Sequence, residues 1–205
     1  MRIAFGLKAH SGWAVLVAIG RSGGILQVTE RRRIELVAER DSDWPGQPYH
    51  AADGKPIAQA RRIIERGIAD AHACASAELH AALARARDAS HAVVACAVLT
   101  PSPLPDWTVE QILAVHLRMH QAEGALYPDA LLRAAAGCGL DAQAVEQKSL
   151  IAAAQAALGK SFDATMQALA AAGKSNGPPW GADQKKAALA AVMALASDAR
   201  GNRGR

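Results

Sequence analysis

A nearly continuous apolar run over residues 93–99 is the feature that most constrains the fold of this 205-residue chain. It lies between His91 and a proline-rich segment, 101–105. A run of this length without polar alternation is typical of a central β-strand that is buried on both faces. Such strands occur in sheets with helices on both sides, and ligands usually bind at their carboxyl ends. We therefore expect an α/β fold with a site near the end of this run.

Strand and helix patterns surround this run in an order that fits such a sheet. Apolar runs separated by tight turns predict three antiparallel strands, over residues 3–7, 13–19 and 25–37. Helical periodicity predicts helices over residues 57–89, 108–136, 149–158, 163–172 and 183–197, and a weak fifth strand is predicted over 141–146. Residues 41–50 are expected to form a loop. Gly124 and Pro128 predict a kink or a break in the second helix.

These elements predict a mixed five-stranded sheet, in which three antiparallel strands are followed by α/β units and helices flank the sheet. A hydrophobic content of 51% is enough to bury a sizeable core, and an aromatic content of only 4% favours closely packed helices. We expect one domain over residues 1–198 and a disordered basic tail over residues 199–205.

Charge and cysteine content narrow the function classes. The net charge of +4 is modest, and part of it comes from the tail, so it indicates nucleic-acid binding only weakly. The three cysteines are odd in number and isolated, which argues against a disulfide framework or a thiolate metal site. Residues 1–10 resemble neither a signal peptide nor a membrane span, so we expect a cytoplasmic protein without a membrane partner.

His116, His120 and Glu123 form the first candidate site, because their spacing places all three on one stripe of a helix. Imidazoles four residues apart can present nitrogens to one point, and Glu123 could complete the set for one divalent transition metal such as zinc. The same residues could instead act as a metal-free acid–base pair. A third interpretation is an ordinary helix surface with a weak histidine–glutamate pair.

Two further polar groups flank the predicted elements. Lys8, His10, Ser11 and Gly12 follow the first strand, where a turn can hold a phosphate with its backbone N–H groups, although an ordinary hairpin turn explains them too.

Asp183 and Lys185 open the last helix, where Asp183 could serve as a helix cap or as a site residue. His50 lies in the loop after Gln47 and could reach the same cleft. We expect these residues to bind a ligand together with the first turn.

The element order, with a glycine-containing turn in the first hairpin and a last helix that opens on Asp183, resembles the ribonuclease H-like superfamily. Within it, the chain is similar to the RuvC-type Holliday junction resolvases and their YqgF-like relatives. It also resembles a group of uncharacterised bacterial proteins that share four short segments, residues 11–13, 47–50, 120–124 and 178–181. The resemblance implies a ribonuclease H-like fold and, in the resolvases, a metal-binding aspartate at the start of the last helix.

Active nucleases of this superfamily hold two divalent metals with clustered carboxylates, one of them on the first strand. Here residues 5–9 contain no carboxylate, and Lys8 would repel a metal ion. We therefore expect a degenerate cleft that binds nucleic acid, a nucleotide or another phosphate-bearing ligand.

Two alternatives stay open at this point. One is a phosphoester hydrolase or nuclease with one divalent metal at His116, His120 and Glu123, in which His120, Glu123 and Asp183 are catalytic. The other is a non-catalytic protein whose alanine-rich helices pair with a second copy of the chain.

Overall fold

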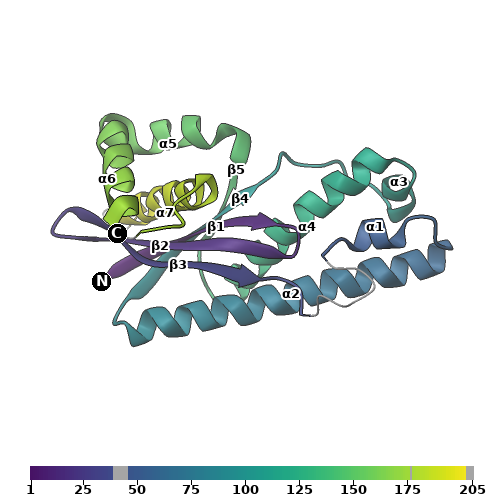
Figure 1. Cartoon of the computed structure of the whole chain (residues 1–205). Helices are drawn as coiled ribbons and strands as arrows, with labels where there is room; N and C mark the ends of the chain where they lie inside the picture. Colours follow the sequence, from purple (N-terminus) through teal and green to yellow (C-terminus); the bar gives the residue numbers. More distant parts are fainter. Residues whose placement is uncertain (39–45, 176, 202–205) are drawn as a thin grey trace.

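Five strands form one sheet in the order β3-β2-β1-β4-β5 (Figure 1). A computed structural model describes residues 1–38, 46–175 and 177–201. The strands are β1 (Arg2–His10), β2 (Trp13–Ser22), β3 (Ile25–Glu35), β4 (Ala92–Thr100) and β5 (Ala142–Glu146). The first three pair antiparallel, whereas β4 runs parallel to both β1 and β5. This arrangement confirms the predicted mixed sheet.

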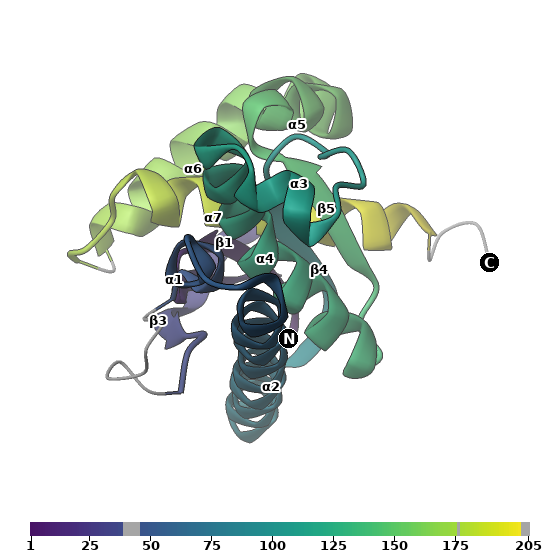
Figure 2. The ribbon, with the colours of Figure 1, turned by 90° about the vertical axis from the view of Figure 1, so that its right-hand side faces the viewer.

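Helices cover both faces of the sheet. They are α1 (Pro48–Ala52), α2 (Ile57–Asp88), α3 (Val109–Leu113), α4 (His116–Gly137), α5 (Leu150–Leu158), α6 (Phe162–Ser175) and α7 (Ala182–Gly201), with 3₁₀ turns η1 (Gln147–Ser149) and η2 (Gly159–Ser161). Figure 2 shows α2 on one side of the sheet and α5, α6 and α7 on the other. Among the described residues, no helix has the length and apolar character that a membrane crossing requires.

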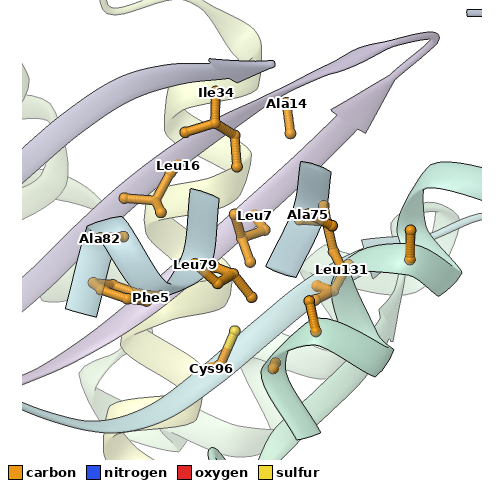
Figure 3. Packing of buried hydrophobic residues seen from close by; sticks show 14 of the residues in the cluster. Phe5, Leu7, Ala14, Leu16, Ile34, Ala75, Leu79, Ala82, Cys96 and Leu131 are labelled. Atoms are coloured by element: carbon orange, nitrogen blue, oxygen red, sulfur yellow. The ribbon is translucent and has the colours of Figure 1, made fainter. Parts of the chain in front are cut away.

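Alternation along β1 divides the core into two halves. Phe5 and Leu7 point towards α2 and α4, where they pack with Leu79 and Leu131 (Figure 3). Ala4 lies on the other face and packs with the alanine-rich part of α7. Because side chains alternate between the faces of a strand, Gly6 and Lys8 share the α7 face with Ala4. Lys8 is thereby directed to the side of the sheet where α7 begins.

The contact between β1 and α7 depends on Gly6. A Cβ atom added there would overlap the carbonyl oxygen of Ala187 and would lie 2.9 Å from the backbone nitrogen of Ala191. Both alanines are fully buried. The helix backbone therefore rests directly on the strand, which fixes where the first turn of α7 meets the end of β1.

Two local features differ from the sequence expectation. Part of the predicted loop 41–50 forms helix α1, while residues 39–45 lie outside the described part of the chain. The expected break at Gly124 or Pro128 is wrong: α4 continues through both, and the chain breaks instead at Val115, which is extended (φ −138°, ψ 113°). A proline removes only one backbone N–H bond, and the packing of this helix against α2 and the sheet compensates for it.

At the C-terminus, α7 includes residues 199–201 of the expected tail. Residues 202–205 lie outside the described chain.

Candidate functional site

A cavity of about 440 Å³ lies at the carboxyl ends of β1 and β4. Its lining includes Lys8 from β1, Thr100 from β4, His120 from α4 and Lys148 from η1. Segments from the first, middle and later parts of the chain therefore meet at the edge where ligands of α/β sheets usually bind. No carboxylate belongs to this lining, within the part of the chain that the structure describes.

Lys8 is half-buried between the sheet and the start of α7. Burial lowers the pKa of its ammonium group; the nearby charge of Asp183 opposes this shift, and that of Lys186 adds to it. The Lys8 Nζ donates to the carbonyl of its neighbour Ala9 at 3.1 Å, and within the described part of the chain its other two donors have no acceptor. A partly desolvated ammonium group interacts more strongly with a phosphate than a fully hydrated one does.

Asp183, in the first turn of α7, pairs with His10 at the end of β1. The His10 Nε2 and the Asp183 Oδ2 are 2.9 Å apart, and about a third of each side chain is exposed. The His10 ring stacks on Trp13 with a centroid distance of 4.2 Å, and the Arg33 guanidinium lies 4.1 Å from the same Trp13 ring. This pairing occupies the Asp183 carboxylate with a neighbouring side chain.

Three histidines gather beside the cavity. His116 and His120 are exposed on α4, and their Nε2 atoms are 3.0 Å apart. His50 comes from α1, and its ring lies 4.5 Å from that of His120 and 5.4 Å from that of His116. One nitrogen of each ring falls within 4.8 Å of the other two. The three imidazoles can therefore approach a common point.

The Glu123 carboxylate contacts α1, although its position on α4 had suggested a metal ligand beside His116 and His120. Its Oε1 accepts hydrogen bonds from the backbone N–H groups of Tyr49 (2.8 Å) and His50 (3.2 Å). These are the second and third residues of α1, whose own N-cap residue, Gln47, makes no side-chain cap. The carboxylate therefore caps α1 from a distant helix, where the N–H groups of a first turn need an acceptor.

The same carboxylate also orients an imidazole. The Nδ1 of His50 lies 3.3 Å from Glu123 Oε1, while the His50 Nε2 is buried and has no hydrogen-bond partner among the described residues. Burial raises the pKa of Glu123 to about 7, and the two backbone hydrogen bonds partly offset this shift. Glu123 thus links the fold of α1 to the direction of the His50 ring.

The candidate residues fall into two groups that meet at the cavity. Lys8, His10 and Asp183 form one, and the three histidines with Glu123 form the other; Lys8 and His120 line the cavity together.

The other three candidate residues lie outside the cavity lining. Ser11 is exposed, Gly12 packs near Val37 and Gly46 with φ of 80°, and Lys185 is exposed on α7; none of them lines the cavity.

Lys148 lines the cavity from η1 but was not among the residues predicted from the sequence. Its position in the sequence could have indicated it, because Lys148 comes two residues after Glu146, the last residue of β5. Parallel strands end at the same edge of a sheet, so the ends of β4 and β5 could have been considered together.

The two-metal carboxylate cluster implied by the ribonuclease H-like resemblance does not fit these residues. Lys8 occupies the end of β1, the cavity lining holds no carboxylate within the described chain, and Asp183 is paired with His10. Two adjacent cations need clustered negative oxygen ligands. The residues described in this cleft therefore do not fit a two-metal mechanism.

Comparison with known proteins supports the fold. No family model and no curated protein matches the chain. Solved structures do match. One is RuvC of Thermus thermophilus in complex with a Holliday junction substrate, with a TM-score of 0.52 and 11% identity over 98% of this chain and 97% of that chain. Another is a structure of Thermus thermophilus RuvC, with a TM-score of 0.51 and 11% identity over 97% of this chain and 96% of that chain. The protein therefore has a RuvC-like ribonuclease H fold.

Proposed function

We propose that this protein binds nucleic acid in the cavity at the ends of β1 and β4. The observation that carries the proposal is the lining of that cavity, in which Lys8 and Lys148 provide positive charge and, among the described residues, no carboxylate takes part. Ammonium groups and hydrogen-bond donors in a concave site are suited to phosphate oxygens. The resemblance to a RuvC solved with a Holliday junction substrate adds support for a nucleic-acid ligand.

The architecture of the cleft favours contacts to the phosphate backbone. Lys8 is a point charge held by β1, and Lys148 belongs to η1, so two separate elements bring a positive charge to the cavity lining. His120, Gln121 and Thr100 add side chains that can donate hydrogen bonds to phosphate oxygens. Phosphate contacts position a nucleic acid without reading its sequence, so we expect affinity to depend more on nucleic-acid shape than on base sequence.

Salt dependence tests this proposal directly. We expect anisotropy of labelled single strands, duplexes and four-way junctions to show log affinity falling linearly with log salt concentration. Lys8→Ala should weaken binding to all sequences and reduce the salt slope by about 1, since one phosphate contact is lost. Lys160→Ala removes an exposed charge on η2, outside the cavity lining, and should leave the slope unchanged.

Two results would contradict the proposal. One is the absence of binding to every nucleic acid at low salt. The other is an equal change in slope for Lys8→Ala and Lys160→Ala, which would mean that the interaction is spread over the surface. Binding of a free nucleotide with no binding of oligonucleotides would restrict the cavity to a small phosphate-bearing ligand.

A second candidate function is phosphoester hydrolysis, favoured by the presence of His120 in both the cavity lining and the histidine cluster. In this alternative His120, Glu123 and Asp183 carry the catalysis. Turnover of a phosphodiester with added divalent metal, lost in His120→Ala and kept in Lys160→Ala, would support hydrolysis. Equal turnover in both variants would remove it.

A further inference from the structure

We propose that His50, His116 and His120 bind one divalent transition metal of the zinc type, with Glu123 as the group that orients His50 rather than as a ligand. The proposal rests on the geometry of the histidine cluster and does not depend on nucleic-acid binding. It differs from the set expected from the sequence in its third member, which comes from α1 instead of α4.

The distances within the cluster suit a small ion. The Nε2 atoms of His116 and His120 are 3.0 Å apart, and one nitrogen of His50 lies within 4.8 Å of both. Ligand nitrogens around a tetrahedral zinc ion with bonds of about 2.0 Å are about 3.3 Å apart. The α4 pair already has nearly this separation, because residues four apart on a helix project from the same face. The His50 nitrogen would move closer to the α4 pair to complete the set.

The contacts of His50 give it the properties of a metal ligand. Its Nδ1 faces the Glu123 carboxylate at 3.3 Å, and its buried Nε2 has no partner among the described residues. A ligand histidine commonly donates its second ring N–H to a carboxylate, which fixes the ring orientation and raises the basicity of the metal-binding nitrogen. Glu123 is itself held by the backbone N–H groups of Tyr49 and His50. The orienting contact is therefore built into the junction of α1 and α4.

Donor type determines which metal fits. Three imidazoles are suited to zinc and its neighbours, whereas magnesium and calcium prefer oxygen ligands. A positive charge beside the histidines would oppose metal binding. Arg118 lies between His116 and His120 in the sequence, but its guanidinium donates to the carbonyl of Gln111 and lies 5.0 Å from the Trp107 ring. Three protein ligands leave a fourth position, and the exposure of His116 and His120 gives water access to it. An open position of this kind distinguishes a reactive zinc site from a closed structural one.

The test is metal binding by the full-length chain after treatment with a chelator. We expect zinc to bind with a stoichiometry of one, measured by competition with a chromophoric chelator. Cobalt(II) should give the visible absorption of a four- or five-coordinate ion, and millimolar magnesium should not compete. His116→Ala and His120→Ala change exposed side chains, so they should fold normally and lose at least about 100-fold in zinc affinity. His80→Ala, an exposed histidine on α2, is the matched control and should bind as the wild type does.

Two further variants decide between His50 and Glu123 as the third ligand. His50→Gln keeps an amide that can donate to Glu123 but removes the imidazole, and it should weaken zinc binding more than Glu123→Gln does. Loss of an orienting group costs about 10–100-fold in metal affinity. The reverse order would overturn the assignment, as would wild-type protein that binds no zinc, or variants of His116 and His120 that bind as tightly as His80→Ala does.

Discussion

Gly6→Ala is expected to destabilise the protein severely, by about 3 kcal/mol or more. The new Cβ atom would overlap the carbonyl oxygen of Ala187 and approach the carbonyl carbon to 2.8 Å. These are backbone atoms of a buried helix, so no side chain can rotate away to make room. The helix must move off the sheet, which opens the half of the core that contains Ala4 and the alanines of α7.

Thermal and urea unfolding measure this effect, with Gly137→Ala as the control. A Cβ atom at Gly137, the last residue of α4, meets nothing within 4 Å. This second variant should therefore match the wild type or gain slightly, because alanine favours helix more than glycine does. If Gly6→Ala melted within a degree or two of Gly137→Ala, the direct contact between β1 and α7 would be refuted.

Glu123→Ala is expected to have the second-largest effect, a loss of about 2–4 kcal/mol in the free energy of unfolding. The substitution removes the acceptor of two backbone N–H groups at the start of α1 and of the His50 ring. A donor left buried without a partner costs about 1–3 kcal/mol. The loss should be measured with a chelator present, so that metal binding does not contribute.

Amide exchange locates this effect. Protection of residues 47–52 should fall in Glu123→Ala more than protection of the sheet, because the carboxylate caps α1 specifically. Glu123→Gln keeps an acceptor oxygen and should recover much of the stability. Glu110→Ala removes an exposed carboxylate on α3 and should change stability by no more than about 0.5 kcal/mol. Equal protection of residues 47–52 in wild type and Glu123→Ala would contradict the capping role.

The pH dependence of stability follows from the raised pKa of Glu123. Because its pKa is about 7 in the folded protein and near 4.5 in an unfolded chain, the folded state binds this proton more tightly. Its contribution to stability is therefore fully present below about pH 4.5 and is lost as pH rises to about 7. The difference in unfolding free energy between wild type and Glu123→Gln should fall over this interval in metal-free protein. A difference that stayed constant over this interval would contradict the raised pKa of Glu123.

The fold could be predicted from the sequence because its signals are local. Residues 93–99 could be assigned to a buried inner strand from their apolar character alone, and the structure places β4 inside the sheet, between β1 and β5. The helix break at Val115 and the short helix α1 could not be predicted in this way. The start of α1 is capped by Glu123, which comes from more than seventy residues away in the chain.

The candidate site, like the fold, could be predicted from the sequence only in part. Helical spacing places His116 and His120 together, and the structure has their Nε2 atoms 3.0 Å apart. Nothing in the spacing connects His50 to them, or Lys148 to Lys8, because each pair joins segments that are distant in sequence. The helical stripe also groups Glu123 with the two histidines, but its carboxylate is directed to the backbone of α1.

The amino-acid sequence alone determined the strand and helix classes, the mixed sheet and the pair of histidines on one helix, since periodicity and turn residues act over a few neighbouring positions. Only the tertiary structure decided that His50 joins this pair, that Glu123 caps α1, and that Lys8 and Lys148 share one cavity. Such contacts arise when buried faces pack against one another, and the spacing of residues along the chain carries no record of which distant segments will meet.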